Sequence, residues 1–171
     1  MNEFYLVMRV SHVVLGALWV GTVTFMAFIL MPAVAEAGPD GAKVMAGLIR
    51  RKLLNIVPTV ALVNVISGLW LYWKYTGGFD RTLSGTPGAM VFGTGGILAI
   101  IALHIGLLAM RRNILRAGAL AAKAGGLPDG AERAVLMAES MARRKRAMRA
   151  GPIVAVILLV TTALMAIGHY V

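Results

Sequence analysis

Four long apolar stretches constrain the fold of this chain more than any other feature of its sequence. They run from Phe4 to Met31, from Leu53 to Trp73, from Met90 to Met110 and from Ile153 to Val171. A helix of about 20 apolar residues crosses the roughly 30 Å hydrocarbon core of a bilayer. Of the 171 residues, 59% are hydrophobic and only 14% are charged. The sequence therefore predicts one all-α domain over residues 1–171, a four-helix transmembrane bundle whose main solvent is the lipid bilayer.

The basic residues are distributed unevenly over the three connections between these stretches. The second connection contains only Lys74 and Arg81. The first and third are far more basic, with Lys43, Arg50, Arg51 and Lys52 in the first and Arg111, Arg112, Arg116, Lys123, Arg133, Arg143, Arg144, Lys145, Arg146 and Arg149 in the third. Because Lys and Arg mark cytoplasmic loops, we expect a multi-pass protein of a bacterial-type inner membrane with both termini outside. The net charge of +10 then reflects topology, and no nucleic-acid binding is expected.

The third connection, residues 111–150, is rich in Ala and Arg and is interrupted at Gly125–Asp129. This pattern predicts a helical hairpin in the cytoplasm. The third helix continues out of the membrane and, after a turn, a helix with Asp129 as its N-cap leads into the fourth span. Its basic cluster, Arg143–Arg149, has two interpretations. It sets the topology and contacts anionic lipid headgroups, or it docks a protein.

Ionisable side chains inside a membrane span are costly, and they are therefore the first candidates for function. Four such residues occur, namely Arg9, His12, His104 and His169. At about 100° per residue, His12 shares a helix face with Gly16 and Trp19, and a glycine one turn from a histidine leaves room for a flat ligand. Trp19 would line that cavity, and Arg9 would pair with Glu3 or with a haem propionate.

The same helical spacing predicts that the other two histidines also face into the bundle. His104 shares a face with Gly93, Ile97 and Ile100, and His169 shares one with Leu158, Thr162 and Met165. By depth, His12 and His169 lie in the outer half of the membrane and form the easiest pair, whereas a tilt of the first helix would bring His12 toward His104. Each histidine could instead simply bond a neighbouring helix.

The second helix contributes no histidine but a small polar patch of Asn64, Ser67 and Gly68. Such a patch suits close helix packing, a haem propionate or the second nitrogen of a histidine. The chain has no cysteine, so a metal site would depend on His, Met or oxygen ligands, with His12 and His104 as the metal-ligand candidates.

Two parts of the sequence resemble a known family. His12, followed by Trp19-Val20-Gly21 and by Phe28-Ile29-Leu30-Met31-Pro32, resembles the first helix of HemJ-type protoporphyrinogen oxidases and of CopD-like four-helix membrane proteins. The stretch from Arg51 to Leu71 looks like their second helix, and His104 falls where the family carries a histidine late in helix three. The resemblance implies a bundle that binds haem b, with His12 as the first axial ligand and His104 as the next.

The chain departs from the HemJ-type pattern at the start of the third helix, where Met90–Gly95 contains no lysine. Three functions are therefore left as alternatives. They are a haem b redox protein that transfers electrons or oxidises a substrate, a non-catalytic accessory subunit of a larger membrane complex, and a carrier of copper or a small solute. Partner membrane subunits, a homo-oligomer, a quinone and a porphyrin are the partners that these alternatives imply.

Overall fold

The computed structural model describes residues 3–171, and within this range the chain is helical with no strand. The elements in chain order are α1 (Glu3–Phe25), the π-helical η1 (Met26–Leu30), α2 (Met31–Glu36), α3 (Gly38–Arg50), α4 (Leu53–Tyr75), α5 (Arg81–Ser84), α6 (Pro87–Ile105), the π-helical η2 (Gly106–Arg111), α7 (Arg112–Gly125) and α8 (Ala131–Ile167). Four continuous helical stretches are long and apolar enough to cross a membrane, namely Glu3–Glu36, Leu53–Tyr75, Pro87–Gly125 and Ala131–Ile167. The predicted all-α class with four candidate spans is confirmed.

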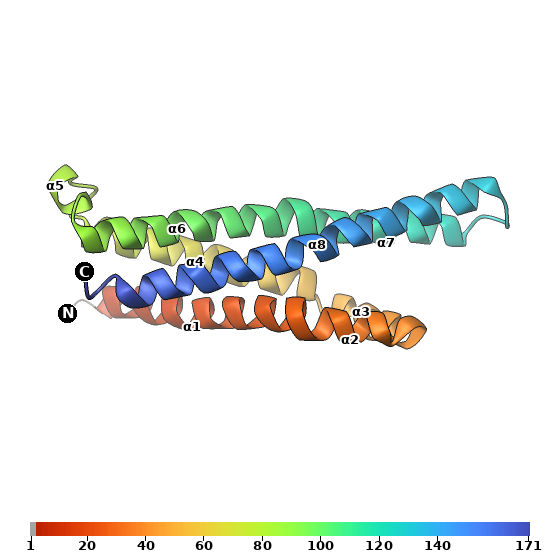
Figure 1. Ribbon diagram of the computed structural model, residues 1–171, viewed down its shortest axis with the longest axis horizontal. Coiled ribbons are helices and arrows are strands. Elements are labelled where there is room, and N and C mark those ends of the chain that lie inside the picture. The colour runs from red at the N-terminus through yellow and green to blue at the C-terminus, as the bar shows by residue number, and fades with distance from the viewer. Residues whose placement is uncertain (1–2) are drawn as a thin grey trace.

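The four long helices form a ring in which α1 packs on α4, α4 on α6, α6 on α8, and α8 on α1. Both termini and α5 lie at one end of the molecule, and α7 with the first part of α8 extends from the other end (Figure 1). The short helices α2 and α3 fold against each other toward that second end (Figure 1). The chain therefore has a terminal end and a hairpin end.

Small side chains bring the four helices close together. Ala61, Ala99, Ala102 and Ala155 are buried in the core, where they surround larger residues such as Leu158. In a membrane, helices associate through such close packing, because lipid tails are as apolar as leucine and give no hydrophobic drive. The large apolar side chains on the outside of the ring are correspondingly exposed and suited to contact lipid.

The observed helices differ in length from the apolar stretches that predicted them. The first stretch continues as helix to Glu36, and the third continues to Gly125. The fourth was expected to be helical from Ile153 to Val171, but α8 begins at Ala131 and ends at Ile167. Gly168 follows its last residue, and glycine is the residue that most often ends a helix.

The π-helical segment η1 has a local cause in the sequence. Pro32 follows it closely, and a proline cannot donate a hydrogen bond to the carbonyl four residues earlier, which is that of Phe28. The wider turn accommodates this defect, and the N–H of Met31 donates to the carbonyl of Met26 instead. The first helix thus continues past its proline to Glu36.

The residues between the third and fourth stretches form a hairpin of α7 and the first part of α8. Ala117 and Ala124 of α7 and Ala147 of α8 are buried, and the Ser140 hydroxyl donates to the Ala117 carbonyl at 2.8 Å. Asp129 does not act as the expected N-cap. Gly130 occupies that position, no side chain caps the helix, and the Asp129 carboxylate pairs with Arg133.

We predict that Gly41→Ala displaces α3 from its position against α2 and α4. A Cβ at this position would lie 2.0 Å from the Val34 carbonyl oxygen, which is far inside van der Waals contact with backbone. Because the sequence has no cysteine, spin labels at Val44→Cys and Ile56→Cys report the distance from α3 to α4 without background. The distance distribution should broaden and lengthen in Gly41→Ala.

Gly47→Ala is the matched control on the same helix, because a Cβ there meets nothing within 4 Å. This variant should leave the α3–α4 distance unchanged. An unchanged distance in Gly41→Ala as well would show that the α2–α3 turn is not packed as described.

Candidate functional site

His12 lies in the third turn of α1 and contacts α4. Its Nδ1 lies 2.9 Å from the backbone carbonyl oxygen of Asn64. A carbonyl only accepts hydrogen bonds, so Nδ1 donates and carries the proton. In a neutral imidazole the lone pair then resides on Nε2, which is the nitrogen that remains available to a ligand.

The carbonyl that holds His12 also accepts a second hydrogen bond. The Ser67 hydroxyl donates to the Asn64 oxygen at 2.9 Å and lies 3.5 Å from His12 Nδ1. Ser67 and Asn64 are both buried. The sequence-predicted polar patch of α4 therefore meets the predicted histidine of α1, and a backbone oxygen is the atom that joins them.

Two glycines make this contact possible. A Cβ at Gly68 would lie 2.6 Å from His12 Cε1, so the imidazole rests directly on the glycine backbone of α4. A Cβ at Gly16 would lie 3.1 Å from Asn64 Oδ1. Each helix thus contributes one glycine against a polar side chain of the other, which brings α1 and α4 close at this level.

The side chain of Asn64 is the least satisfied polar group of the site. Asn64 is 7% exposed, and its Oδ1 has no hydrogen-bond partner in the described part of the chain. A buried acceptor without a donor costs about 1–3 kcal/mol. This oxygen is therefore a ready acceptor for a donor group brought by water or by a ligand.

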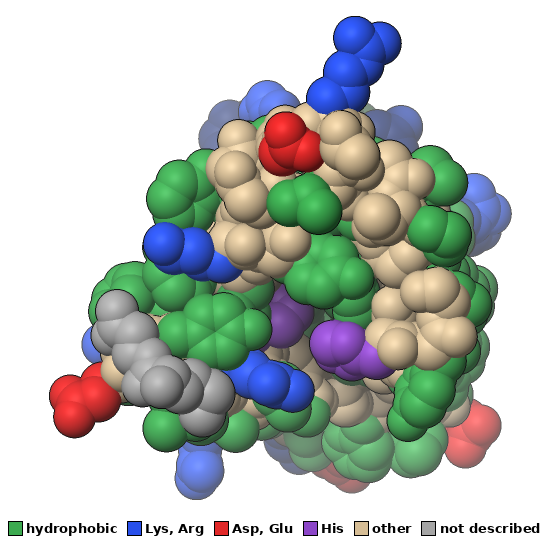
Figure 2. Space-filling model, turned by 90° about the vertical axis from the view of Figure 1, so that its left-hand side faces the viewer, with side chains coloured by type: hydrophobic (Ala, Val, Ile, Leu, Met, Phe, Trp, Pro, Cys, Tyr) green, Lys and Arg blue, Asp and Glu red, His purple; other side chains and the backbone are tan. Residues whose placement is uncertain are grey.

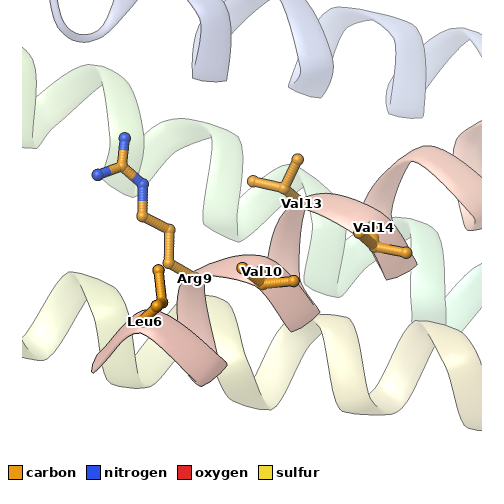
Figure 3. A pocket seen from close by; sticks show the side chains of 5 residues that line it. All are labelled: Leu6, Arg9, Val10, Val13 and Val14. Atoms are coloured by element: carbon orange, nitrogen blue, oxygen red, sulfur yellow. The ribbon is translucent and has the colours of Figure 1, made fainter. Parts of the chain in front are cut away.

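Arg9 and Trp19 lie at different depths relative to His12. Trp19 is only 4% exposed and belongs to the hydrophobic core two turns further along α1, so it packs below the histidine as part of the bundle interior. Arg9 lies one turn nearer the terminal end. It extends from α1 on the side away from α4, beside a depression of ≈ 310 Å³ on the flank of α1 that is lined by Leu6, Arg9, Val10, Val13 and Val14 (Figure 3).

His169 lies just past the end of α8, and its ring packs edge-on against Phe92 with centroids 5.0 Å apart. The view onto the terminal end of the molecule shows two histidine side chains in one recess (Figure 2). His12 lies in the first half of α1 and His169 follows the end of α8, so both histidines lie toward this end. The structure therefore brings His12 and His169 to the same end of the bundle.

His104 lies elsewhere, and its surroundings differ from the sequence expectation. It is exposed on the outer face of α6, together with Ile97, which is 62% exposed. Its Nδ1 donates to the carbonyl oxygen of Ile100 in its own helix at 2.9 Å. The expected inward-facing set of Gly93, Ile97, Ile100 and His104 does not form, and His12 and His104 are not brought together. The set expected to face inward from the last helix does not form either. Leu158 is buried and Met165 is half-buried, but Thr162 and His169 are exposed.

No group of three or more His, Asp or Glu side chains that could hold a metal ion occurs among residues 3–171. Comparison of the chain with protein-family models, with curated proteins and with solved structures gave no match.

Sequence reasoning missed two structural contacts. The first is the acceptor of His12, because a backbone carbonyl has no signature in the sequence. The second is Arg111, to which the sequence assigns only a role in topology. Its Nε donates to the Leu54 carbonyl at 2.9 Å and its Nη2 to Asn55 Oδ1 at 3.0 Å, so it ties η2 to the first turn of α4.

We predict that Gly68→Ala displaces the His12 ring. The new methyl group would occupy the position 2.6 Å from Cε1, and the hydrogen bond to Asn64 would be lost. The free energy of unfolding should fall by about 1 kcal/mol, the typical value of one hydrogen bond. In ¹⁵N NMR of histidine-labelled protein, the wild-type His12 should show a protonated Nδ1 and an unprotonated Nε2, and this pattern should change in Gly68→Ala.

Gly21→Ala on α1 provides the control, since a Cβ at that position meets nothing within 4 Å. It should preserve the nitrogen shifts of His12, and it should not lower the stability, because alanine is the better helix former. A wild-type His12 protonated on Nε2 instead of Nδ1 would contradict the described contact.

Proposed function

We propose that this protein is a haem b-binding membrane redox protein in which His12 is an axial ligand. The observation that carries the proposal is the hydrogen bond from His12 Nδ1 to the Asn64 carbonyl oxygen at 2.9 Å. Metal-ligating histidines almost always donate their other ring N–H to a carbonyl or carboxylate, which fixes the tautomer and raises the basicity of the ligating nitrogen. His12 has this partner and this tautomer.

The surroundings of His12 also suit a haem. Gly68 and Gly16 let the imidazole and the Asn64 side chain pack closely between α1 and α4, which holds the ligating histidine in place. His169 at the same end of the bundle is the favoured second axial ligand, because His104 lies on the outer face of α6. Arg9 would neutralise a propionate. When bound, haem supplies reversible one-electron transfer.

The chain's own residues would then hold and tune the cofactor. Asn64 and Ser67 fix the orientation of His12, and Trp19 closes the interior below it. We place the site in the outer half of a bacterial-type inner membrane, with both termini outside, because the basic residues gather at the hairpin end. A quinone or a partner protein would exchange the electrons. Without the lysine of HemJ-type enzymes, electron transfer is favoured over oxidation of a porphyrin.

A second candidate function is that of an accessory subunit in a larger membrane complex, and His104 favours it. The exposed residues of α6 form one stripe at helical spacing that continues to Leu108 of η2, and His104 lies within it among Met90, Ile97 and Ile101. An ionisable side chain in contact with lipid is costly, and a partner helix that donates to Nε2 would relieve the cost.

We predict that purified protein shows a Soret band and, after reduction with dithionite, a sharp α-band with about one haem per chain in a pyridine haemochrome assay. His12→Ala should abolish the Soret band, because the ligand held by Asn64 is lost. His169→Ala should convert a low-spin spectrum to a high-spin one. His104→Ala is the control and should leave the spectrum intact.

The haem proposal fails if folded wild-type protein is colourless after expression with sufficient haem. It also fails if His12→Ala retains the wild-type spectrum. A spectrum lost in His104→Ala but not in His169→Ala would assign the second ligand to α6 and require a rearrangement of that helix.

For the accessory function, we predict that His104→Leu releases the chain from a larger assembly on blue native gels of mildly solubilised membranes. Ile101→Leu, on the same stripe, conserves the apolar surface and should retain the assembly. A wild-type chain that migrates as a monomer or homodimer would rule this function out.

A further inference from the structure

Three methionines form a stripe on the part of α8 that precedes its apolar half. Met137, Met141 and Met148 are 42%, 66% and 45% exposed. At 100° per residue, their side chains lie within about 40° of one another around the helix axis. We call these three residues the methionine stripe.

Lipid does not account for the exposure of this stripe. Helix α8 runs from Ala131 to Ile167, and Pro152 separates the part that carries the stripe from the membrane-spanning part. Met141 is twelve residues before Ile153, where the apolar stretch begins, which corresponds to about 18 Å along the axis. In Figure 1 the hairpin of α7 and α8 extends away from the bundle along its long axis. Met137 and Met141 are therefore held in water, and Met148, about 8 Å before Ile153, lies nearest the membrane surface.

Basic side chains flank the stripe on both sides. Arg144 and Lys145 are exposed, lie between Met141 and Met148 in the sequence, and make no ion pair within the described residues. Arg143, in contrast, pairs with Glu139 on the side of α8 nearer α7. The positive-inside rule accounts for basic residues near a membrane, but it does not account for apolar side chains between them.

We propose that the methionine stripe, together with Arg144 and Lys145, docks an acidic surface of another protein. Methionine is flexible and polarizable, and it serves at surfaces that adapt to a partner. An apolar centre with charged residues at its rim is the usual anatomy of a protein interface, and the positive rim selects an acidic partner. A second copy of this chain is a poor partner, because the net charge of +10 would repel it.

The test uses a photo-crosslinking amino acid at Met141 in the full-length protein in native membranes. Val135 is the matched control, because it is also 66% exposed but lies about 120° from Met141 around the axis of α8. We expect Met141 to give one protein adduct that is absent at Val135, and mass spectrometry should identify a protein with an acidic surface. Arg144→Glu combined with Lys145→Glu should reduce the adduct yield at least several-fold.

A second measurement keeps the test independent of folding. The identified partner should bind purified full-length protein in nanodiscs, with an affinity that falls as salt rises, and binding should weaken in Met137→Ser/Met141→Ser. Far-UV circular dichroism and gel filtration should show both variants folded and monodisperse. An adduct with lipid or with a second copy of the chain, equal adducts at Met141 and Val135, no adduct at either position, or binding unaffected by the substitutions would each overturn the proposal. None of these outcomes depends on haem.

Discussion

Within a bilayer, every polar group of the chain must find its partner inside the protein, and this constraint shapes both the fold and the site. Most polar side chains of the spans meet it locally. Thr94, Thr161 and Thr162 each donate a hydroxyl to the carbonyl four residues earlier in the same helix, and His104 does the same with Nδ1. His12 is different, because its bond crosses from α1 to α4. A local bond would have satisfied the ring equally well, so the cross-helix bond fixes the orientation of the imidazole relative to a second helix.

That orientation depends on the small residues around it. The imidazole lies on Gly68, and Gly16 receives the Asn64 side chain, so neither helix could carry a larger residue there without moving the other. Glycine is costly in a helix, by about 1 kcal/mol relative to alanine. Two glycines at one helix contact therefore indicate that close packing of α1 against α4 stabilises the protein by more than the glycines cost in helix propensity. The same approach buries Asn64 Oδ1 without a donor, an imperfection of the kind that binding sites tolerate because a ligand removes it.

The four spans could be predicted from hydropathy, and the patch of Asn64, Ser67 and Gly68 could be recognised as suited to bond a histidine nitrogen. The sequence did not decide which histidine the patch contacts. The outward direction of His104 could not be predicted. Helix α6 is apolar on every side, so the sequence of a lipid-exposed helix does not distinguish its inner face from its outer one. The continuation of the fourth span into the hairpin could be predicted, since alanine and arginine favour helix as strongly as the apolar residues do, whereas the end of α8 at Ile167 could not.

The histidine site and the methionine stripe lie at opposite ends of the molecule. Ile167, the last residue of α8 before His169, is 26 residues from Met141 along the same helix, which corresponds to about 39 Å. A partner on the hairpin would therefore not touch the histidines, and α8 is the element that connects the two ends. Pro152 interrupts its hydrogen bonding between them. A Cβ added at the adjacent Gly151 would lie 3.7 Å from Ala27 of η1 and 3.8 Å from Met110 of η2, so Gly151 faces the two π-helical segments. The two π-helical segments and the proline of α8 thus lie near one level of the bundle, between the histidines and the methionine stripe.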